Sequence, residues 1–220
     1  MTLRLRLVRW FLANALLTGI VFLCRGGGSL PTLKAYLVAF AAVGLVSTLT
    51  IKPELEKERI QPGSEGTDPA VRPLASALFV ATVTLGALDL GRLHWGFPFS
   101  KGVQMAAFAV FVAANGLQIW AMTVNAFFST ALRLQAERGH RLVRNGPYRY
   151  VRHPGYLAML LIVPSTAIAL GSKLALFPAA MYEALILFRA SREDNFLLRN
   201  LSGYADYTEE APYRLIPGVW

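Results

Sequence analysis

Long apolar runs alternate with short polar segments along this chain. The four longest runs cover residues 7–24, 33–51, 73–90 and 103–128. Each is close to the ~20 residues that a helix needs to cross ~30 Å of hydrocarbon. Two shorter runs, at residues 154–170 and 174–190, are separated by a Gly-Ser-Lys turn. The pattern therefore predicts an all-α polytopic membrane bundle of about four full spans plus a C-terminal helical hairpin and a tail.

Composition and charge agree with a membrane protein and set its orientation. Hydrophobic residues make up 55% of the 220 residues and charged residues 16%, and the mean hydropathy is +0.43, which excludes an ordinary soluble domain. The net charge of +9 does not indicate nucleic acid, because 17 of the 22 Lys and Arg residues fall on one predicted side of the membrane. The positive-inside rule then places both termini in the cytoplasm, and we expect a bacterial inner-membrane protein that contacts lipid.

Metal and nucleotide-fold chemistry have little support. Cys24 is the only cysteine, and His94, His140 and His153 are scattered along the chain, so no metal-ligand spacing is present. Neither a Rossmann fingerprint nor a P-loop occurs. We therefore expect no bound metal, and we expect no nucleotide bound by a Rossmann fold or a P-loop.

A dense polar and aromatic segment precedes the predicted hairpin. Residues 146–156 read Gly-Pro-Tyr-Arg-Tyr-Val-Arg-His-Pro-Gly-Tyr, and the apolar run begins at Pro154. A purely structural membrane boundary has little need for a histidine, two arginines and three tyrosines in eleven positions. The segment therefore marks a place where a water-soluble reagent can meet a lipid-soluble one.

The region after the hairpin also carries charged and aromatic side chains. Arg189, Arg192 and the pair Glu193-Asp194 fall at helical spacing, which predicts an amphipathic helix that ends before Gly203. The tail that follows has no helical period and carries four further chemistry-bearing residues, Tyr204, Tyr207, Tyr213 and Arg214.

Isolated polar residues inside the apolar runs need an explanation, since polar groups in hydrocarbon are costly. We interpret Asn14, Asn115 and Gln118 as interhelical hydrogen-bonding residues. Asn125, close to Phe128 and Ser129, fits packing and a site equally well. Glu183 lies too far along its helix from Glu193 to share one small site with it.

The motifs occur in a characteristic order. They are Gly146-Pro147-Tyr148, Arg152-His153-Pro154-x-Tyr156, the hairpin, Arg189-x-x-x-Glu193-Asp194-x-x-Leu197, Gly203-Tyr204-x-x-Tyr207 and Arg214-x-x-Pro217. This order resembles the integral-membrane isoprenylcysteine carboxyl methyltransferase and phospholipid methyltransferase family, in particular its bacterial branch. The resemblance covers about residues 145–217. One departure is Asp194, where a second glutamate is usual.

The resemblance implies a methyltransferase that uses S-adenosyl-L-methionine. Residues 1–130 are expected to form the N-terminal transmembrane helices, and residues 131–220 the cofactor-binding and catalytic region. In this family the tail covers a cytoplasm-facing cofactor pocket, and a lipophilic acceptor arrives from the bilayer. The expected cofactor-binding residues are Tyr148, Arg152, His153, Pro154, Tyr156, Glu193, Tyr204 and Tyr207. The expected catalytic residues are Arg214, Glu193 and Asn125.

The implied roles follow the chemistry of the cofactor and acceptor. Glu193 suits the ammonium and sulfonium cations, while His153 and Arg152 suit the cofactor carboxylate. Tyrosine side chains suit the adenine ring, and Arg214 is the expected donor to a carboxylate acceptor.

Three alternatives remain at this point. The same family also methylates amines of phospholipids and thiols, so the acceptor atom is open. An NADPH-dependent membrane reductase of the steroid 5α-reductase type has a similar C-terminal architecture. Its HPNYxGE-like run is replaced here by residues 153–159, His-Pro-Gly-Tyr-Leu-Ala-Met. A non-enzymatic membrane scaffold or transporter explains the spans and leaves the charged, aromatic tail without a role.

Overall fold

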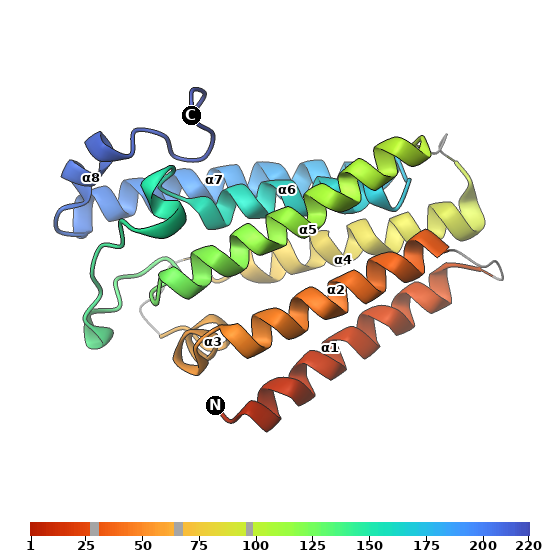
Figure 1. Cartoon of the computed structure of the whole chain (residues 1–220), viewed down its shortest axis with the longest axis horizontal. Coiled ribbons are helices and arrows are strands. Elements are labelled where there is room, and N and C mark those ends of the chain that lie inside the picture. Colours follow the sequence, from red (N-terminus) through yellow and green to blue (C-terminus); the bar gives the residue numbers. More distant parts are fainter. Residues whose placement is uncertain (27–30, 64–67, 96–98) are drawn as a thin grey trace.

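The computed structural model describes residues 1–26, 31–63, 68–95 and 99–220, and all regular elements in these ranges are helical. Six long helices lie side by side (Figure 1). They are α1 (Leu3–Cys24), α2 (Pro31–Thr50), α4 (Val71–Leu88), α5 (Lys101–Val124), α6 (Pro154–Ala169) and α7 (Leu176–Asn200). Two shorter helices and three tight turns complete the described structure. These are α3 (Pro53–Ile60), α8 (Tyr204–Glu210), a π-helical turn at Asp89–Leu93 and 3-10 turns at Ala136–Arg138 and Gly146–Arg149.

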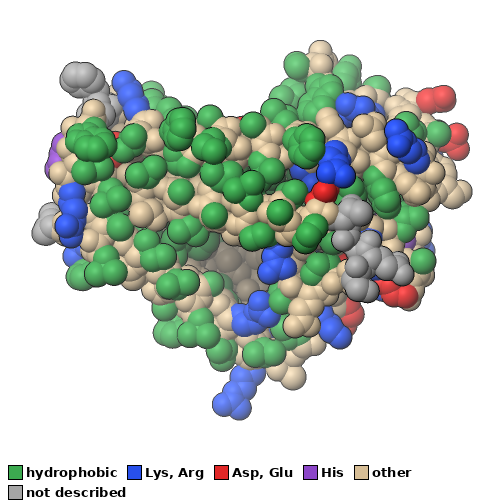
Figure 2. All heavy atoms as spheres, turned by 180° about the vertical axis from the view of Figure 1, so that it is seen from behind, with side chains coloured by type: hydrophobic (Ala, Val, Ile, Leu, Met, Phe, Trp, Pro, Cys, Tyr) green, Lys and Arg blue, Asp and Glu red, His purple; other side chains and the backbone are tan. Residues whose placement is uncertain are grey.

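Four helical segments are long and apolar enough to cross a membrane. They are Leu3–Cys24, Pro31–Thr50, Val71–Leu93 and Lys101–Val124. Many of their large apolar side chains are exposed, for example Phe11, Leu16 and Leu23 of α1, and hydrophobic side chains cover much of the surface in Figure 2. An apolar exterior is stable only in lipid. The structure thus confirms the predicted class, an all-α integral membrane bundle with four spans and a helical hairpin.

Local sequence signals explain where several helices begin. Proline is the first residue of α2, α3 and α6, where its missing N–H is tolerated and its fixed φ favours the helix. The side-chain hydroxyl of Thr2 caps α1 and that of Ser100 caps α5, each accepting a hydrogen bond from a backbone N–H three residues later. These starts fix which residues face inward on each helix.

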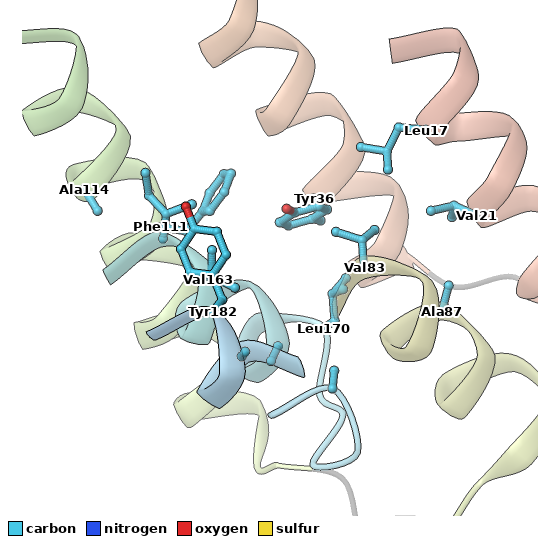
Figure 3. Close-up of a cluster of buried hydrophobic side chains, with 14 of the residues drawn as sticks. Leu17, Val21, Tyr36, Val83, Ala87, Phe111, Ala114, Val163, Leu170 and Tyr182 are labelled. Carbon is cyan, nitrogen blue, oxygen red and sulfur yellow. The ribbon is translucent and has the colours of Figure 1, made fainter. Parts of the chain in front are cut away.

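The core joins all six long helices. Figure 3 shows Tyr36 of α2 among side chains from α1, α4, α5, α6 and α7. Its ring centroid lies 5.0 Å from that of Phe111, and its hydroxyl lies 3.2 Å from Thr166 Oγ1. Aromatic packing combined with a satisfied hydroxyl holds the helices at a fixed separation. The hairpin is therefore packed into the bundle.

The irregular parts of the chain gather at one end of the bundle. The N-terminus, α3, α8 and the long segment between α5 and α6 lie at the left end in Figure 1, and the described ends of the α1–α2, α4–α5 and α6–α7 connections lie at the right end. The predicted polar segment and tail are consequently brought to the same end.

Three expectations need correction. The run at 103–128 ends as a helix at Val124, because Asn125 has extended backbone. The second half of the hairpin and the amphipathic helix are one helix, α7. The tail, predicted to be non-periodic, contains α8, which starts after the left-handed Gly203.

The predicted interhelical role of two asparagines is also wrong. The side-chain amides of Asn14 and Asn115 donate to the carbonyl oxygens of Trp10 and Phe111, four residues back on their own helices. Each bond engages the amide donor within its own helix, without a partner helix. Gln118 lines the cavity described below.

Candidate active site

A cavity of about 390 Å³ lies within the end of the bundle that holds the irregular segments. Its walls come from α3, α4, α5, α6, α7, α8 and the segment between α5 and α6. The volume is within the range of small-molecule sites. Figure 2 shows a hollow on one face of the molecule with Lys or Arg side chains beside it. A small molecule and an apolar chain can thus meet between the helices.

The lining changes character along the cavity. One part is apolar and comes from helices in the bundle: Ala75, Phe79, Val80, Met159 and Ile186. The other part is polar and aromatic: Asn125, Tyr148, Arg152, His153, Tyr156, Glu193, Tyr204 and Tyr207. A molecule with one polar and one apolar end, or a polar and an apolar molecule side by side, fits this arrangement.

Asp194 of α7 organises the wall next to the polar part. Its side chain is 4% exposed and accepts hydrogen bonds from four residues. The distances are 2.9 Å from Arg152 Nε, 2.7 Å from the Tyr204 hydroxyl and 2.7 Å from Arg214 Nε, with His153 Nε2 3.0 Å away. We name these five residues the Asp194 cluster. It ties α7 to the α5–α6 segment, α8 and the tail.

The electrostatics of the Asp194 cluster keep its acid charged and its phenol neutral. Burial by itself would raise the pKa of Asp194, but hydrogen bonds from His153 and Arg152 outweigh it and hold the pKa well below its usual range. Burial raises the pKa of Tyr204, and the Asp194 carboxylate raises it further. The cluster therefore holds one permanent anion against two arginine cations.

Backbone hydrogen bonds hold the tail to the polar segment. The N–H groups of Arg152 and His153 donate to the carbonyl oxygens of Tyr213 and Arg214, at 3.0 and 2.9 Å. Arg152 Nη1 also donates to the carbonyl oxygens of Ala211 and Pro212. The tail is thus fixed beside the Asp194 cluster.

Glu193 precedes Asp194 and faces a different environment. Its side chain is 26% exposed and belongs to the cavity lining. One carboxylate oxygen, Oε2, accepts a hydrogen bond from the Tyr156 hydroxyl at 2.6 Å and lies 3.9 Å from Arg189 Nε. Within the described residues, Oε1 has no hydrogen-bond partner, so the carboxylate keeps an acceptor for a ligand.

Asn125 lies where α5 ends and joins two further lining residues. Its Nδ2 donates to the Tyr148 hydroxyl at 3.1 Å, and its Oδ1 accepts from the backbone N–H of Phe127 at 2.9 Å. The Tyr207 hydroxyl donates to the carbonyl oxygen of Tyr148 at 2.6 Å. Burial raises the pKa of Tyr148, so this phenol stays neutral. These contacts order the aromatic part of the lining.

The close approach of α6 to the α5–α6 segment depends on Gly155. A Cβ atom at this position would lie 2.1 Å from Phe128 Cε2, which no packing tolerates. The absence of a side chain at Gly155 lets the Phe128 ring lie against the start of α6. Phe128 in turn is part of the cavity wall.

The structure brings most of the predicted site residues together. Eight line the cavity, namely Asn125, Tyr148, Arg152, His153, Tyr156, Glu193, Tyr204 and Tyr207. Pro154 starts α6 and Arg214 lies in the Asp194 cluster, and neither lines the cavity. The roles assigned to all ten residues stay predictions.

Several lining residues were not predicted. Arg59 of α3, Phe128 and Arg72 of α4 line the cavity, and in the sequence Arg59 and Phe128 carry only a weak resemblance to the family and Arg72 carries none. The one sequence signal for α3 is the charged pair Glu58-Arg59 after a proline start. Glu58 is anchored by Arg133, whose Nη2 donates to Glu58 Oε2 at 2.9 Å. This buried ion pair fixes α3 against the α5–α6 segment.

The fold and the cavity define a class: an integral membrane protein whose described residues form a helical bundle with a cavity of small-molecule size at one end. The model of the isoprenylcysteine carboxyl methyltransferase (ICMT) family matches residues 105–199. This range includes most of α5, all of α6, most of α7 and the polar segment that precedes α6.

Proteins with related sequences or folds agree with this match. The cobalt-zinc-cadmium resistance protein CzcN of Cupriavidus metallidurans is 28% identical over 138 residues, 60% of this chain and 58% of that protein. The nickel-cobalt-cadmium resistance protein NccN of Alcaligenes xylosoxydans xylosoxydans is 29% identical over 138 residues, 60% of this chain and 59% of that protein. The alignments thus span less than two thirds of either relative.

A solved structure shares the fold. The structure of the eukaryotic intramembrane Ras methyltransferase ICMT matches with a TM-score of 0.54 and 20% identity, and the match covers 87% of this chain and 69% of that one. Together, the family match and the common fold confirm the resemblance. Residues 105–199 of this chain are similar to the isoprenylcysteine carboxyl methyltransferase family, and the chain shares the fold of the solved structure.

Proposed function

We propose that this protein transfers a methyl group from S-adenosyl-L-methionine to a lipophilic acceptor, most like a carboxyl O-methyltransferase. One observation carries the proposal: a single cavity joins the Glu193 carboxylate and its surrounding phenols to apolar side chains of α4, α6 and α7. The polar part suits a charged, water-soluble methyl donor, and the apolar part suits the hydrocarbon of an acceptor.

The residues present fit the proposed methyl donor. Its ammonium and sulfonium cations need an anion, and Glu193 offers one with Oε1 still available. Its adenine needs a flat, apolar slot, and Tyr148, Tyr207 and Phe128 line the cavity with aromatic rings. His153 and Arg152, the expected partners of the donor's carboxylate, line the cavity but are engaged by Asp194. In the proposal these two residues therefore position the cavity wall and do not bind that carboxylate.

The proposed chemistry asks the protein for orientation and exclusion of water. When bound, S-adenosyl-L-methionine supplies a methyl group on a positively charged sulfur. Glu193 holds the cationic end, and the aromatic side chains fix the direction in which the methyl group points. The apolar walls keep water from competing with the acceptor. A carboxylate acceptor needs no proton removed, whereas an amine or a thiol would need a base beside the acceptor atom.

Both predicted regions of the chain, residues 1–130 and residues 131–220, contribute side chains to the cavity. The proposed catalytic region at residues 131–220 supplies Glu193 and most of the phenols, but Arg59 and residues of α4 within 1–130 also line the cavity. The acceptor therefore touches both regions in the proposed complex.

Orientation follows from charge. The cavity lies at the end of the bundle where the N-terminus and α8 are found. The positive-inside rule assigns this end to the cytoplasm, where the methyl donor is made available, and the membrane is proposed to be the bacterial inner membrane.

The test is a binding measurement on detergent-solubilised protein. We expect saturable binding of S-adenosylhomocysteine in a calorimeter and no saturable binding of NADPH. Incubation with radiolabelled S-adenosyl-L-methionine and host lipid extract should then give one labelled lipophilic product, whose base stability separates an ester from a methylated amine or thioether. Binding of NADPH alone would replace the methyltransferase proposal with the reductase alternative.

A further inference from the structure

Arg59 of α3 is a cation in the cavity wall with an unused hydrogen-bond donor. Its guanidinium carbon lies 5.0 Å from the centroid of the Phe128 ring, and the residue belongs to the lining. Its Nη1 atom is buried and has no hydrogen-bond partner within the described residues. The ring contact fixes the plane of the guanidinium without neutralising its charge.

Other buried arginines of the described structure are paired with acids. Arg133 pairs with Glu58 at 2.9 Å and Arg152 with Asp194 at 2.9 Å. Among the described side chains, no carboxylate lies within ion-pair distance of Arg59. Within residues 1–26, 31–63, 68–95 and 99–220, no carboxylate therefore supplies the counter-charge for Arg59.

The local field adds to this imbalance. Burial lowers the pKa of Arg59, Tyr156 opposes the shift, and the nearby Arg72 cation lowers the pKa further. Arg72 is held there because its Nη1 donates to the carbonyl oxygens of Arg59 and Ile60, at 3.2 and 2.7 Å. An arginine nevertheless stays protonated in proteins. A buried cation beside a second cation is costly without an anion, so the arrangement calls for an anionic ligand.

The position of Arg59 indicates which ligand supplies that anion. Tyr156, Arg59 and Glu193 all line the cavity, and the Tyr156 hydroxyl donates a hydrogen bond to Glu193 while the phenol also influences the pKa of Arg59. Tyr182, from the membrane half of α7, also interacts with Arg59. Arg59 therefore lies where the apolar part of the lining meets the polar part, which is where the head of a lipophilic acceptor must be for methyl transfer.

We propose that Arg59 binds the carboxylate of the lipophilic acceptor and sets its position opposite the methyl donor. This inference rests on the proposed function. In the transfer, a carboxylate oxygen forms a bond to the methyl carbon while the bond from that carbon to the sulfonium breaks. The sulfonium becomes a neutral thioether and the carboxylate a neutral ester, with no proton released. The product ester has lost the charge that Arg59 binds, which favours its release into the bilayer.

The experiment compares two probes, N-acetyl-S-farnesylcysteine and its carboxamide, on purified protein in detergent. The variants are Arg59→Met, which removes the charge at similar length, and Arg59→Lys, which keeps it. Lys57→Met is the matched control, because Lys57 is an exposed cation on the same short helix. Affinity for each probe and for S-adenosylhomocysteine is measured by calorimetry, and thermal stability is measured without ligand.

We expect the wild-type protein to bind the carboxylate about 10- to 100-fold more tightly than the carboxamide. Arg59→Met should abolish this preference, Arg59→Lys should keep part of it, and Lys57→Met should keep all of it. The affinity for S-adenosylhomocysteine should change by less than about twofold in all three variants. The melting temperature of ligand-free Arg59→Met should equal or exceed that of the wild type, because an unpaired buried cation has been removed.

Three results would overturn the inference. Equal wild-type affinity for the two probes would mean that no cation of the protein binds the carboxylate of the acceptor. A loss of S-adenosylhomocysteine affinity in Arg59→Met with the probe preference intact would assign the cation to the carboxylate of the methyl donor. A lower melting temperature of ligand-free Arg59→Met would make the residue structural. The proposed function fails separately, if the wild type does not bind S-adenosylhomocysteine.

Discussion

Glu193 and Asp194 are adjacent acids on α7, yet they lie in opposite environments. Asp194 is buried and is surrounded by the donors of the Asp194 cluster. Glu193 faces the cavity, and only one of its oxygens accepts a hydrogen bond within the described structure. An acid with its partners complete stabilises the fold, whereas one with an acceptor left over is available to a ligand. The same contrast separates Arg152, which is fully engaged, from Arg59.

Asp194→Asn tests the structural half of this comparison and should have the largest effect on stability. The change removes the buried anion and leaves the Arg152 and Arg214 cations without it, so we expect a loss of about 3–5 kcal/mol in the free energy of unfolding. The measurement is thermal unfolding in detergent. Asp206→Asn, at an exposed position of α8, is the control and should leave the melting temperature unchanged. An unaltered melting temperature in Asp194→Asn would contradict the structural role of the cluster.

Glu193→Gln should give the reverse pattern, with stability kept and binding lost. Removing the charge that faces the proposed methyl donor should cost about 1.5–3 kcal/mol of binding free energy, or about a 10- to 150-fold weaker affinity for S-adenosylhomocysteine. Calorimetry measures the affinity, and the melting temperature of the ligand-free protein should change little. Glu183→Gln, on the same helix and outside the cavity lining, should bind like the wild type. If only Glu183→Gln loses affinity, the methyl donor binds near Glu183 and not near Glu193, and the proposed position of the site along α7 is wrong.

The pH dependence of stability should sharpen the comparison further. The pKa of Asp194 is below its unfolded value of about 3.9, so its stabilising contribution is complete above about pH 4 and is lost as the pH falls toward the folded pKa. We expect this contribution to fall by up to about 1.4 kcal/mol for each pH unit below 4. Melting temperatures between pH 7 and pH 3 test this, with a steeper acid decline in the wild type than in Asp194→Asn. Parallel curves for the two proteins would show that another group dominates acid unfolding.

Tyr148→Phe should have the smallest effect. It removes the hydroxyl that accepts from Asn125 Nδ2, and we expect a loss of about 0.5–1.5 kcal/mol in stability. Affinity for S-adenosylhomocysteine should stay within about threefold of the wild type if Asn125 serves packing. Tyr150→Phe, at an exposed tyrosine of the same segment, is the control. A larger loss of affinity in Tyr148→Phe would show that the Tyr148 hydroxyl and its partner Asn125, and not the Tyr148 ring alone, serve the cofactor site.

The spans were predictable from sequence because the bilayer imposes a length and a composition on every helix that crosses it. Residues 33–51 and 73–90 correspond closely to α2 and α4. The end of α5 was missed, because Ala126, Phe127 and Phe128 continue the apolar run after the helix has ended. Hydropathy reports the environment of a residue and does not report where its backbone leaves the helix.

The site was predictable only in part. The polar segment and the Glu193-Asp194 pair stood out because their side chains are unusual at a membrane boundary. Which of the two acids is buried depends on Arg152 and Tyr204, which are 42 and 10 positions away from Asp194 in the chain. Arg59 reaches the cavity through the path of α3, and no local pattern reports a tertiary path of this kind.

The tail contacts have a consequence for how the protein is made. Membrane helices insert one after another during synthesis, but the wall of the cavity needs Tyr204 and Tyr207 of α8 and the carbonyl groups of Tyr213 and Arg214. These residues leave the ribosome only after the last helix of the hairpin has been made. A chain interrupted after α7 would thus lack this part of the cavity wall, and under the proposed function only molecules whose synthesis has gone past Arg214 would bind the methyl donor.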